Sequence, residues 1–209
     1  MSNGKFIVFE GIDGAGKSTQ VNLLTEKLVS LGYDVVLTAE PTTLPSGKAL
    51  RQALSGKDKK SECEMATMFV LDRIAHNIDK ENGIIPLCEQ GKIVISDRYY
   101  YSTLAYQGHT TDYEWVKKMN LSCPDIKRPD LCIYLDLLPE QSLARIKARN
   151  EEVEIYENLE KLTKVRNTFL SVIDDLKRDG EKIFIVNANE QIDDIAAKIS
   201  AIVKENILD

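Results

Sequence analysis

The sequence reads Gly11-Ile12-Asp13-Gly14-Ala15-Gly16-Lys17-Ser18 directly after a short apolar run at residues 6–9. This stretch matches the pattern G-x-x-x-x-G-K-S/T, and leucines at helical spacing follow it. Glycines let the backbone curl so that successive N–H groups point at phosphate oxygens, and the positive end of the following helix adds to their effect. The pattern therefore predicts a loop that binds the phosphates of a nucleoside triphosphate. Its candidate phosphate-binding residues are Gly11, Ile12, Asp13, Gly14, Ala15, Gly16, Lys17, Ser18 and Thr19.

Four more short apolar runs follow the loop, at residues 34–38, 93–96, 131–135 and 183–186. They lack the clean alternation of a half-exposed strand, which is typical of parallel strands covered on both faces. The segments between them are mostly too long for hairpins and carry the 3.6-residue period of helices. The chain is therefore predicted to be one α/β domain over residues 1–209, a three-layer α/β/α P-loop NTPase fold with a five-stranded parallel sheet.

A stretch dense in charge runs from Arg145 to Glu160. One interpretation is a solvated helical hairpin, and the other is a short helical lid over the phosphate-binding loop. We expect the lid, at about residues 143–157.

The composition restricts the partners that the protein can have. A formal net charge of -6 repels nucleic acids and anionic membranes at long range, so we expect neither as a partner. The four cysteines show no C-x-x-C spacing, which argues against a zinc site and fits a reducing compartment. The N-terminus does not resemble a signal peptide, and no apolar run reaches the roughly 18 residues that cross a bilayer. We expect a cytoplasmic protein that binds small molecules.

A second motif, SDRYYYSTLAYQ, begins where the third predicted strand ends. Asp97 stands at the end of that strand, where a carboxylate can hold a metal ion or its water. Arg98 offers a planar guanidinium that matches a phosphate, although the two side chains could also form a structural ion pair. Together with the phosphate-binding loop, the motif predicts Ser18 and Asp97 as ligands of Mg²⁺ and Lys17 and Arg98 as catalytic cations.

These motifs resemble those of the thymidylate kinase family. FEGIDGAGKST, a Glu-Pro dipeptide after the second strand, MFVLDR and DRYYYSTLAYQ occur in the order and spacing of that family over residues 6–107, with a weaker match to about residue 170. The resemblance implies a homodimeric kinase that uses Mg²⁺ to transfer the γ-phosphate of ATP to dTMP, giving dTDP and ADP for dTTP biosynthesis. The alternatives are another pyrimidine nucleotide or deoxynucleoside kinase on the same scaffold, and a nucleotide-dependent regulatory ATPase. A GTPase is disfavoured because no NKxD motif follows a later strand.

The resemblance also implies the residues that hold dTMP. Phe69 would stack on thymine and Arg73, on the same helix face, would donate to its O4 atom. Tyr106 would lie against C2' and exclude a ribose hydroxyl. In the family, the other matching positions contact the 3'-hydroxyl, the acceptor phosphate and the edge of the base. The implied set is Asp13, Phe69, Arg73, Arg98, Thr103 and Tyr106.

One branch of the family has an arginine in the loop where this chain has Gly14. The other branch carries catalytic arginines on the lid, and this chain resembles it. The resemblance therefore implies Arg145 and Arg149 as catalytic residues, beside Lys17 and Arg98, and it leaves open which of the two acts in transfer.

The loop after the second strand departs from the family pattern. Many members have an arginine before the Glu-Pro dipeptide, where this chain has Ala39, and Gly-Gly-Thr after it, where this chain has Thr42-Thr43-Leu44. We expect Arg51, on the following helix, as a candidate source of positive charge in this region.

Overall fold

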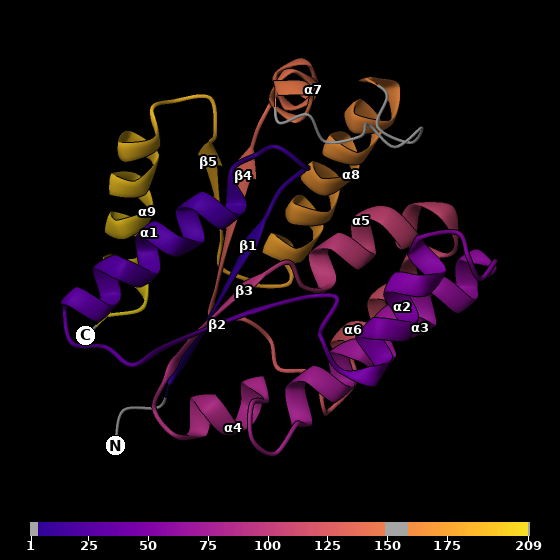
Figure 1. Cartoon of the computed structure of the whole chain (residues 1–209), viewed down its shortest axis with the longest axis horizontal. Helices are drawn as coiled ribbons and strands as arrows, with labels where there is room; N and C mark the ends of the chain where they lie inside the picture. The colour runs from indigo at the N-terminus through magenta and orange to yellow at the C-terminus, as the bar shows by residue number, and fades with distance from the viewer. Residues whose placement is uncertain (1–3, 149–158, 209) are drawn as a thin grey trace.

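The computed structural model describes residues 4–148 and 159–208. A central sheet is covered by helices on both faces (Figure 1). Its strands are β1 (Lys5–Glu10), β2 (Val35–Ala39), β3 (Ile93–Asp97), β4 (Leu131–Asp136) and β5 (Ile183–Asn187). The helices are α1 (Lys17–Ser30), α2 (Pro45–Leu54), α3 (Glu62–Ile78), α4 (Ile84–Glu89), α5 (Tyr100–Thr110), α6 (Tyr113–Leu121), α7 (Pro139–Ala148), α8 (Leu159–Arg178) and α9 (Ile192–Asn206).

All pairings in the sheet are parallel, and the strand order is β2-β3-β1-β4-β5. The five strands predicted from the apolar runs are confirmed, and their ends differ from the prediction by at most one residue. β1 lies at the centre and is wholly buried from Phe6 to Glu10, which explains why its sequence shows no alternation. The predicted α/β fold is confirmed.

The helices form the two outer layers. Figure 1 shows α1 and α9 on one face of the sheet and α5 with α8 on the other. In the sheet, β2 and β3 lie on one side of β1, and β4 and β5 lie on its other side. The carboxyl end of β1 therefore lies at the topological switch point. Ligands of open α/β sheets bind in the crevice at this point.

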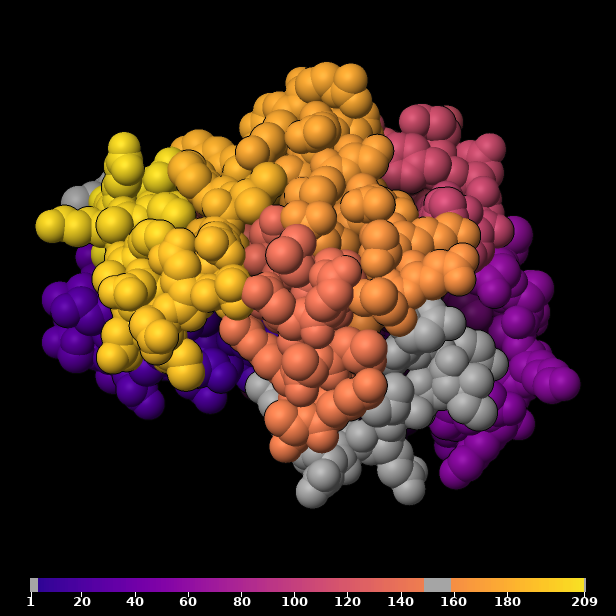
Figure 2. All heavy atoms as spheres, turned by 90° about the horizontal axis from the view of Figure 1, so that it is seen from above, coloured from indigo at the N-terminus to yellow at the C-terminus, as the bar shows by residue number. Residues whose placement is uncertain are grey.

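The predicted lid overlaps the end of α7, and residues 149–158, including Arg149, lie outside the described residues. In the space-filling view from above, the segment that contains α7 lies between those that contain α8 and α9 (Figure 2). Within the part of the chain that the structure describes, no helix is long and apolar enough to cross a membrane.

Candidate active site

The phosphate-binding loop has the conformation that its glycines predict. Gly11 has a φ of 147°, and a Cβ there would lie 2.7 Å from the carbonyl oxygen of Leu135. Gly16, directly before α1, has a φ of 90°, which an L side chain rarely adopts. Lys17 opens α1, and its Nζ donates to the carbonyl oxygens of Gly11 (3.1 Å) and Ile12 (3.3 Å). The lysine is therefore held over the loop where phosphates would lie.

The two predicted metal ligands meet at the ends of neighbouring elements. β1 and β3 pair with Phe9 opposite Asp97, so the carboxylate of Asp97 lies beside the loop that follows β1. The Ser18 hydroxyl donates to Asp97 Oδ2 at 3.2 Å, and Asp97 Oδ1 is buried with no hydrogen-bond partner in the structure.

A hydroxyl beside a carboxylate with an unsatisfied oxygen fits Mg²⁺, a hard cation that keeps several waters and binds substrate phosphates. Among residues 4–148 and 159–208, no cluster of three or more His, Cys, Asp or Glu side chains offers a dedicated metal cage.

Burial and the nearby positive charge of Arg98 lower the pKa of Lys17 from 10.5 to about 8. Bound phosphates favour the charged amine, so they should raise this pKa again. We therefore predict that a non-hydrolysable ATP analogue binds with proton uptake, approaching one proton per site at about pH 8.5 and falling toward zero near pH 7.

Titration calorimetry in two buffers of different ionisation enthalpy measures this uptake directly. A Lys27→Ala variant, changed at an exposed lysine on the same helix, should behave like the parent. Equal proton counts at pH 7 and pH 8.5 in the parent would contradict the depressed pKa.

Glu10 is a site residue that sequence reasoning missed. It ends β1, is completely buried, and accepts hydrogen bonds from the backbone N–H groups of Tyr99 (2.8 Å) and Ser102 (3.1 Å) and from the Ser102 hydroxyl (2.7 Å). Burial raises its pKa, and the charge of Arg98 acts in the opposite direction. Glu10 thus fixes the first turn of α5 beside Arg98. The sequence feature that could have identified Glu10 is its position as an acidic residue at the end of a wholly apolar run.

Arg98 stands in an unusual backbone conformation between two cavities. Its φ is 72°, the only positive φ at a non-glycine residue in the described chain. Its guanidinium pairs with Asp13 and donates to Ser102 Oγ at 3.1 Å. A backbone strained in this way persists only where its surroundings enforce it, and such strain gathers at functional sites.

The first cavity, of about 320 Å³, is lined by the phosphate-binding loop together with Asp97, Arg98 and Glu40. The second, of about 270 Å³, is lined mainly by α3 and α5. Asp13, Glu40 and Arg98 border both cavities, so a group bound in one lies next to a group bound in the other.

The second cavity brings together all six residues that the sequence predicted for dTMP: Asp13, Phe69, Arg73, Arg98, Thr103 and Tyr106. Its other lining residues are Glu40, Pro41, Leu54, Tyr99, Ser102 and Gln107. Gln107 was missed, and its Oε1 atom is buried without a partner in the structure, so this side chain has hydrogen-bonding capacity to offer a ligand.

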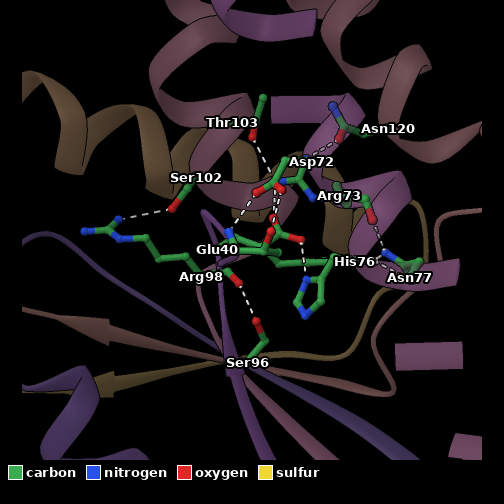
Figure 3. A network of polar contacts seen from close by, with 12 residues as sticks. Glu40, Asp72, Arg73, His76, Asn77, Ser96, Arg98, Ser102, Thr103 and Asn120 are labelled. Carbon is green, nitrogen blue, oxygen red and sulfur yellow. Dashed lines mark hydrogen bonds and ion pairs between the residues drawn. The ribbon is translucent and has the colours of Figure 1, made fainter. Parts of the chain in front are cut away.

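Arg73 is held in the wall of this cavity by a network of polar contacts (Figure 3). It is 1% exposed, and its Nη1 donates to Asn120 Oδ1 at 2.5 Å. Its Nη2 donates to Glu40 Oε2 at 2.6 Å and to Thr103 Oγ1 at 3.1 Å. His76 Nδ1 lies 3.0 Å from the other oxygen of Glu40. Because the Thr103 hydroxyl accepts from Arg73, its own hydrogen is left to donate to a ligand.

Arg145 lies on the outer side of the phosphate-binding loop. Its guanidinium donates to the carbonyl oxygens of Gly14 (3.3 Å) and Ala188 (2.9 Å). From the same helix, Ser142 Oγ donates to the carbonyl oxygen of Asp13 at 2.5 Å. α7 therefore supports the loop, and Arg145 connects it to the segment after β5.

The nucleotide loop, the Ser18–Asp97 pair and an adjoining cavity that shares Arg98 define a P-loop kinase of small molecules. Comparison with known proteins gives the family. The profile of the thymidylate kinase family matches residues 9–199. The chain belongs to the thymidylate kinase family.

Similar proteins come from both archaea and bacteria. The chain is 41% identical, over 98% of both chains, to a protein of Pyrococcus horikoshii named probable thymidylate kinase. It is 42% identical to a thymidylate kinase of Leptospira interrogans, over 87% of this chain and 90% of the other. It is 39% identical to a thymidylate kinase of Desulfotalea psychrophila, over 98% of both.

Proposed function

We propose that this protein transfers the γ-phosphate of ATP to dTMP, giving dTDP and ADP. The observation that carries the proposal is the second cavity, which gathers the six expected dTMP residues and opens onto the phosphate cavity at Arg98. Membership of the thymidylate kinase family supports it.

Transfer is direct, without a covalent enzyme intermediate, so positioning and electrostatics carry the catalysis. Lys17 and the loop N–H groups hold the donor phosphates, and Arg98 binds the acceptor phosphate from its place between the cavities. Ser18 and Asp97 would hold Mg²⁺, which neutralises charge on the β- and γ-oxygens when it is bound.

The second cavity selects a base with a carbonyl at its 4-position. The guanidinium of Arg73 and the free hydrogen of the Thr103 hydroxyl are both donors, so they suit the O4 atom of thymine. The amino group of cytosine would place a donor against donors and leave buried groups unpaired, which disfavours it. Phe69, half-buried in the wall of the cavity, supplies an apolar face for the ring.

A deoxynucleoside kinase is the rival on this scaffold, and it would phosphorylate a 5'-hydroxyl. Arg98 favours a monophosphate acceptor, because its guanidinium is placed to bind a phosphate at the point where the two cavities meet. Thymidine, offered beside dTMP as acceptor, separates the two possibilities.

We predict that dTMP is the best acceptor, followed by dUMP, with UMP far behind. A pocket gains only roughly 1–3 kcal/mol from the thymine methyl, so dUMP should remain a measurable substrate. A buried, unpaired ribose hydroxyl against Tyr106 costs about 1–3 kcal/mol more. The Tyr106 ring is fixed edge-on against Phe169, with ring centroids 6.0 Å apart, so it cannot easily give way.

The measurement is the initial rate with dTMP, dUMP, UMP, dCMP, AMP and thymidine at one ATP concentration. Tyr106→Ala should narrow the gap between dUMP and UMP, whereas Tyr106→Phe should preserve it. If UMP, AMP or thymidine is the best acceptor of the parent enzyme, the thymidylate assignment is wrong.

We further propose a cytoplasmic homodimer with a lid at about residues 143–157. The exposed apolar side chains of Leu71 and Ile78, seven residues apart on α3, support a self-association face. Arg145, or Arg149 beyond the described residues, would place positive charge on the transferring phosphoryl group.

A further inference from the structure

Asp72 is a buried carboxylate outside both cavities of the active site. It is 1% exposed and lies on α3 directly before Arg73. Its Oδ2 accepts from the backbone N–H of Thr42 at 2.8 Å. Its Oδ1 accepts from the hydroxyls of Thr42 (2.6 Å) and Ser46 (2.7 Å). Both oxygens are thus used, and all three donors come from the segment between β2 and the first turn of α2.

This segment forms part of both cavities. Glu40 lines the two of them, and Pro41 lines the second. Arg73 binds Glu40 (Figure 3), and Asp72 binds Thr42, two residues further along the chain than Glu40. Two consecutive residues of α3 therefore hold this segment. Arg73 holds it at Glu40, which lines both cavities, and Asp72 holds it at Thr42, which lines neither.

The remaining contacts of the segment also hold its backbone rather than a ligand. Arg51 donates to the carbonyl oxygens of Pro41 (2.8 Å) and Thr42 (2.5 Å), so the charge that we expected near the acceptor is bound to the loop itself. Gly47 allows close approach, because a Cβ there would lie 2.0 Å from the carbonyl oxygen of Thr42.

The departure at residue 42 gives Asp72 one of its three donors. The side chain of Thr42 supplies a hydroxyl that a glycine lacks, and the structure gives this hydroxyl to Asp72. A carboxylate can accept three hydrogen bonds without offering a hydrogen of its own. Alanine has no acceptor and would leave all three donors without this partner, whereas asparagine could keep its oxygen for the Thr42 N–H and donate its NH₂ group to the two hydroxyls.

We propose that Asp72 is a positioning residue of the acceptor site. It fixes the β2–α2 loop, so that Glu40 stays on Arg73 and the second cavity keeps the shape that receives the acceptor. The proposal rests on the proposed function only for the identity of the acceptor, because the anchoring of Thr42 can be measured without any substrate.

The decisive variant is Asp72→Ala, because it removes every acceptor of this group. We expect the KM for dTMP to rise roughly tenfold or more, because a displaced wall of the site misplaces the acceptor. The KM for ATP should stay within about twofold, since neither Thr42 nor Ser46, which donate to Asp72, lines the phosphate cavity. Hydrogen exchange at the Thr42 amide should accelerate by a similar factor, because its acceptor is lost.

Thr42→Val provides a second test should Asp72→Ala fold poorly. It removes one hydrogen bond to Asp72, together with the bond that the Thr42 hydroxyl accepts from the Leu44 N–H, and keeps the backbone bond to Asp72, so a smaller rise in the KM for dTMP is expected. In the double variant the two changes should not add, since both act through one interaction. Thr43→Val is the matched control, because this neighbouring side chain is exposed. It should behave like the parent.

An unchanged KM for dTMP with normal exchange at Thr42 would overturn the proposal, and so would an equal rise in the KM values for ATP and dTMP. If the parent prefers another acceptor, the proposed function fails, and the same comparison with that acceptor still decides the role of Asp72.

Discussion

Replacement of Lys17 by alanine is expected to lower the turnover number by about 10²–10³-fold or more, while the fold survives. The side chain supplies the positive charge that meets the β- and γ-phosphates, and this charge matters most as the phosphoryl group is transferred. Its amine donates to the carbonyl oxygens of Gly11 and Ile12 and lies 4.0 Å from Asp13 Oδ1, and the loop owes its shape to glycines. Loss of the amine should therefore have little effect on the fold.

The measurement is single-turnover phosphoryl transfer at saturating ATP, with thermal unfolding of the same samples. Lys27→Ala again serves as the control, because it removes an exposed lysine from the same helix. Near-normal transfer by a folded Lys17→Ala enzyme would exclude the loop as the donor site.

The fold could be predicted from the sequence because its main signals are local. Five short apolar runs with helical segments between them predict a parallel sheet, whereas the strand order, with β1 at the centre, comes from the structure. The parallel register then brings Ser18 and Asp97 together, although they are 79 residues apart. The two side chains meet because the carboxyl ends of neighbouring parallel strands lie at one edge, and their role as Mg²⁺ ligands stays a prediction.

The support behind the site could not be predicted in the same way. Arg73 was expected to touch the base, but nothing local showed that Glu40, Thr103 and Asn120 would hold its guanidinium. These residues come from different elements, and their side chains meet only after the helices pack. The family resemblance predicted residues that line the second cavity, and Arg73 was also unusual in an otherwise apolar helix. The sequence did not identify those that hold such residues in place.

Arg51 shows the converse case, a residue that was expected to serve the acceptor but that supports the loop instead. Its charge and its place on the helix after the Glu-Pro loop suggested a role toward the acceptor. In the structure, two backbone carbonyl groups of that loop use its guanidinium. A cation near a phosphate site binds the nearest unsatisfied acceptors, and a loop with unpaired carbonyl oxygens provides them.

Removal of the Arg98 side chain should lower kcat/KM for dTMP by roughly 10³-fold, the effect of losing an arginine from a phosphoryl-transfer site. The cleanest deletion is Arg98→Gly rather than Arg98→Ala. Arg98 has a φ of 72°, which glycine adopts freely and alanine does not, so the glycine variant removes the side chain without adding backbone strain. Arg98→Lys keeps a positive charge but loses the planar pair of donors, and it should fall between the parent and the glycine variant.

The sharpest test of this role compares ligands that differ by one group. The parent should bind dTMP much more tightly than thymidine, because only dTMP carries the phosphate that Arg98 can hold. In Arg98→Gly the two affinities should become nearly equal, with thymidine almost unaffected, since the base contacts of Phe69 and Arg73 remain. Calorimetric titration of both ligands gives the two affinities. If Arg98→Gly still discriminates dTMP from thymidine as the parent does, Arg98 serves only as the structural partner of Asp13, with which it pairs in this structure.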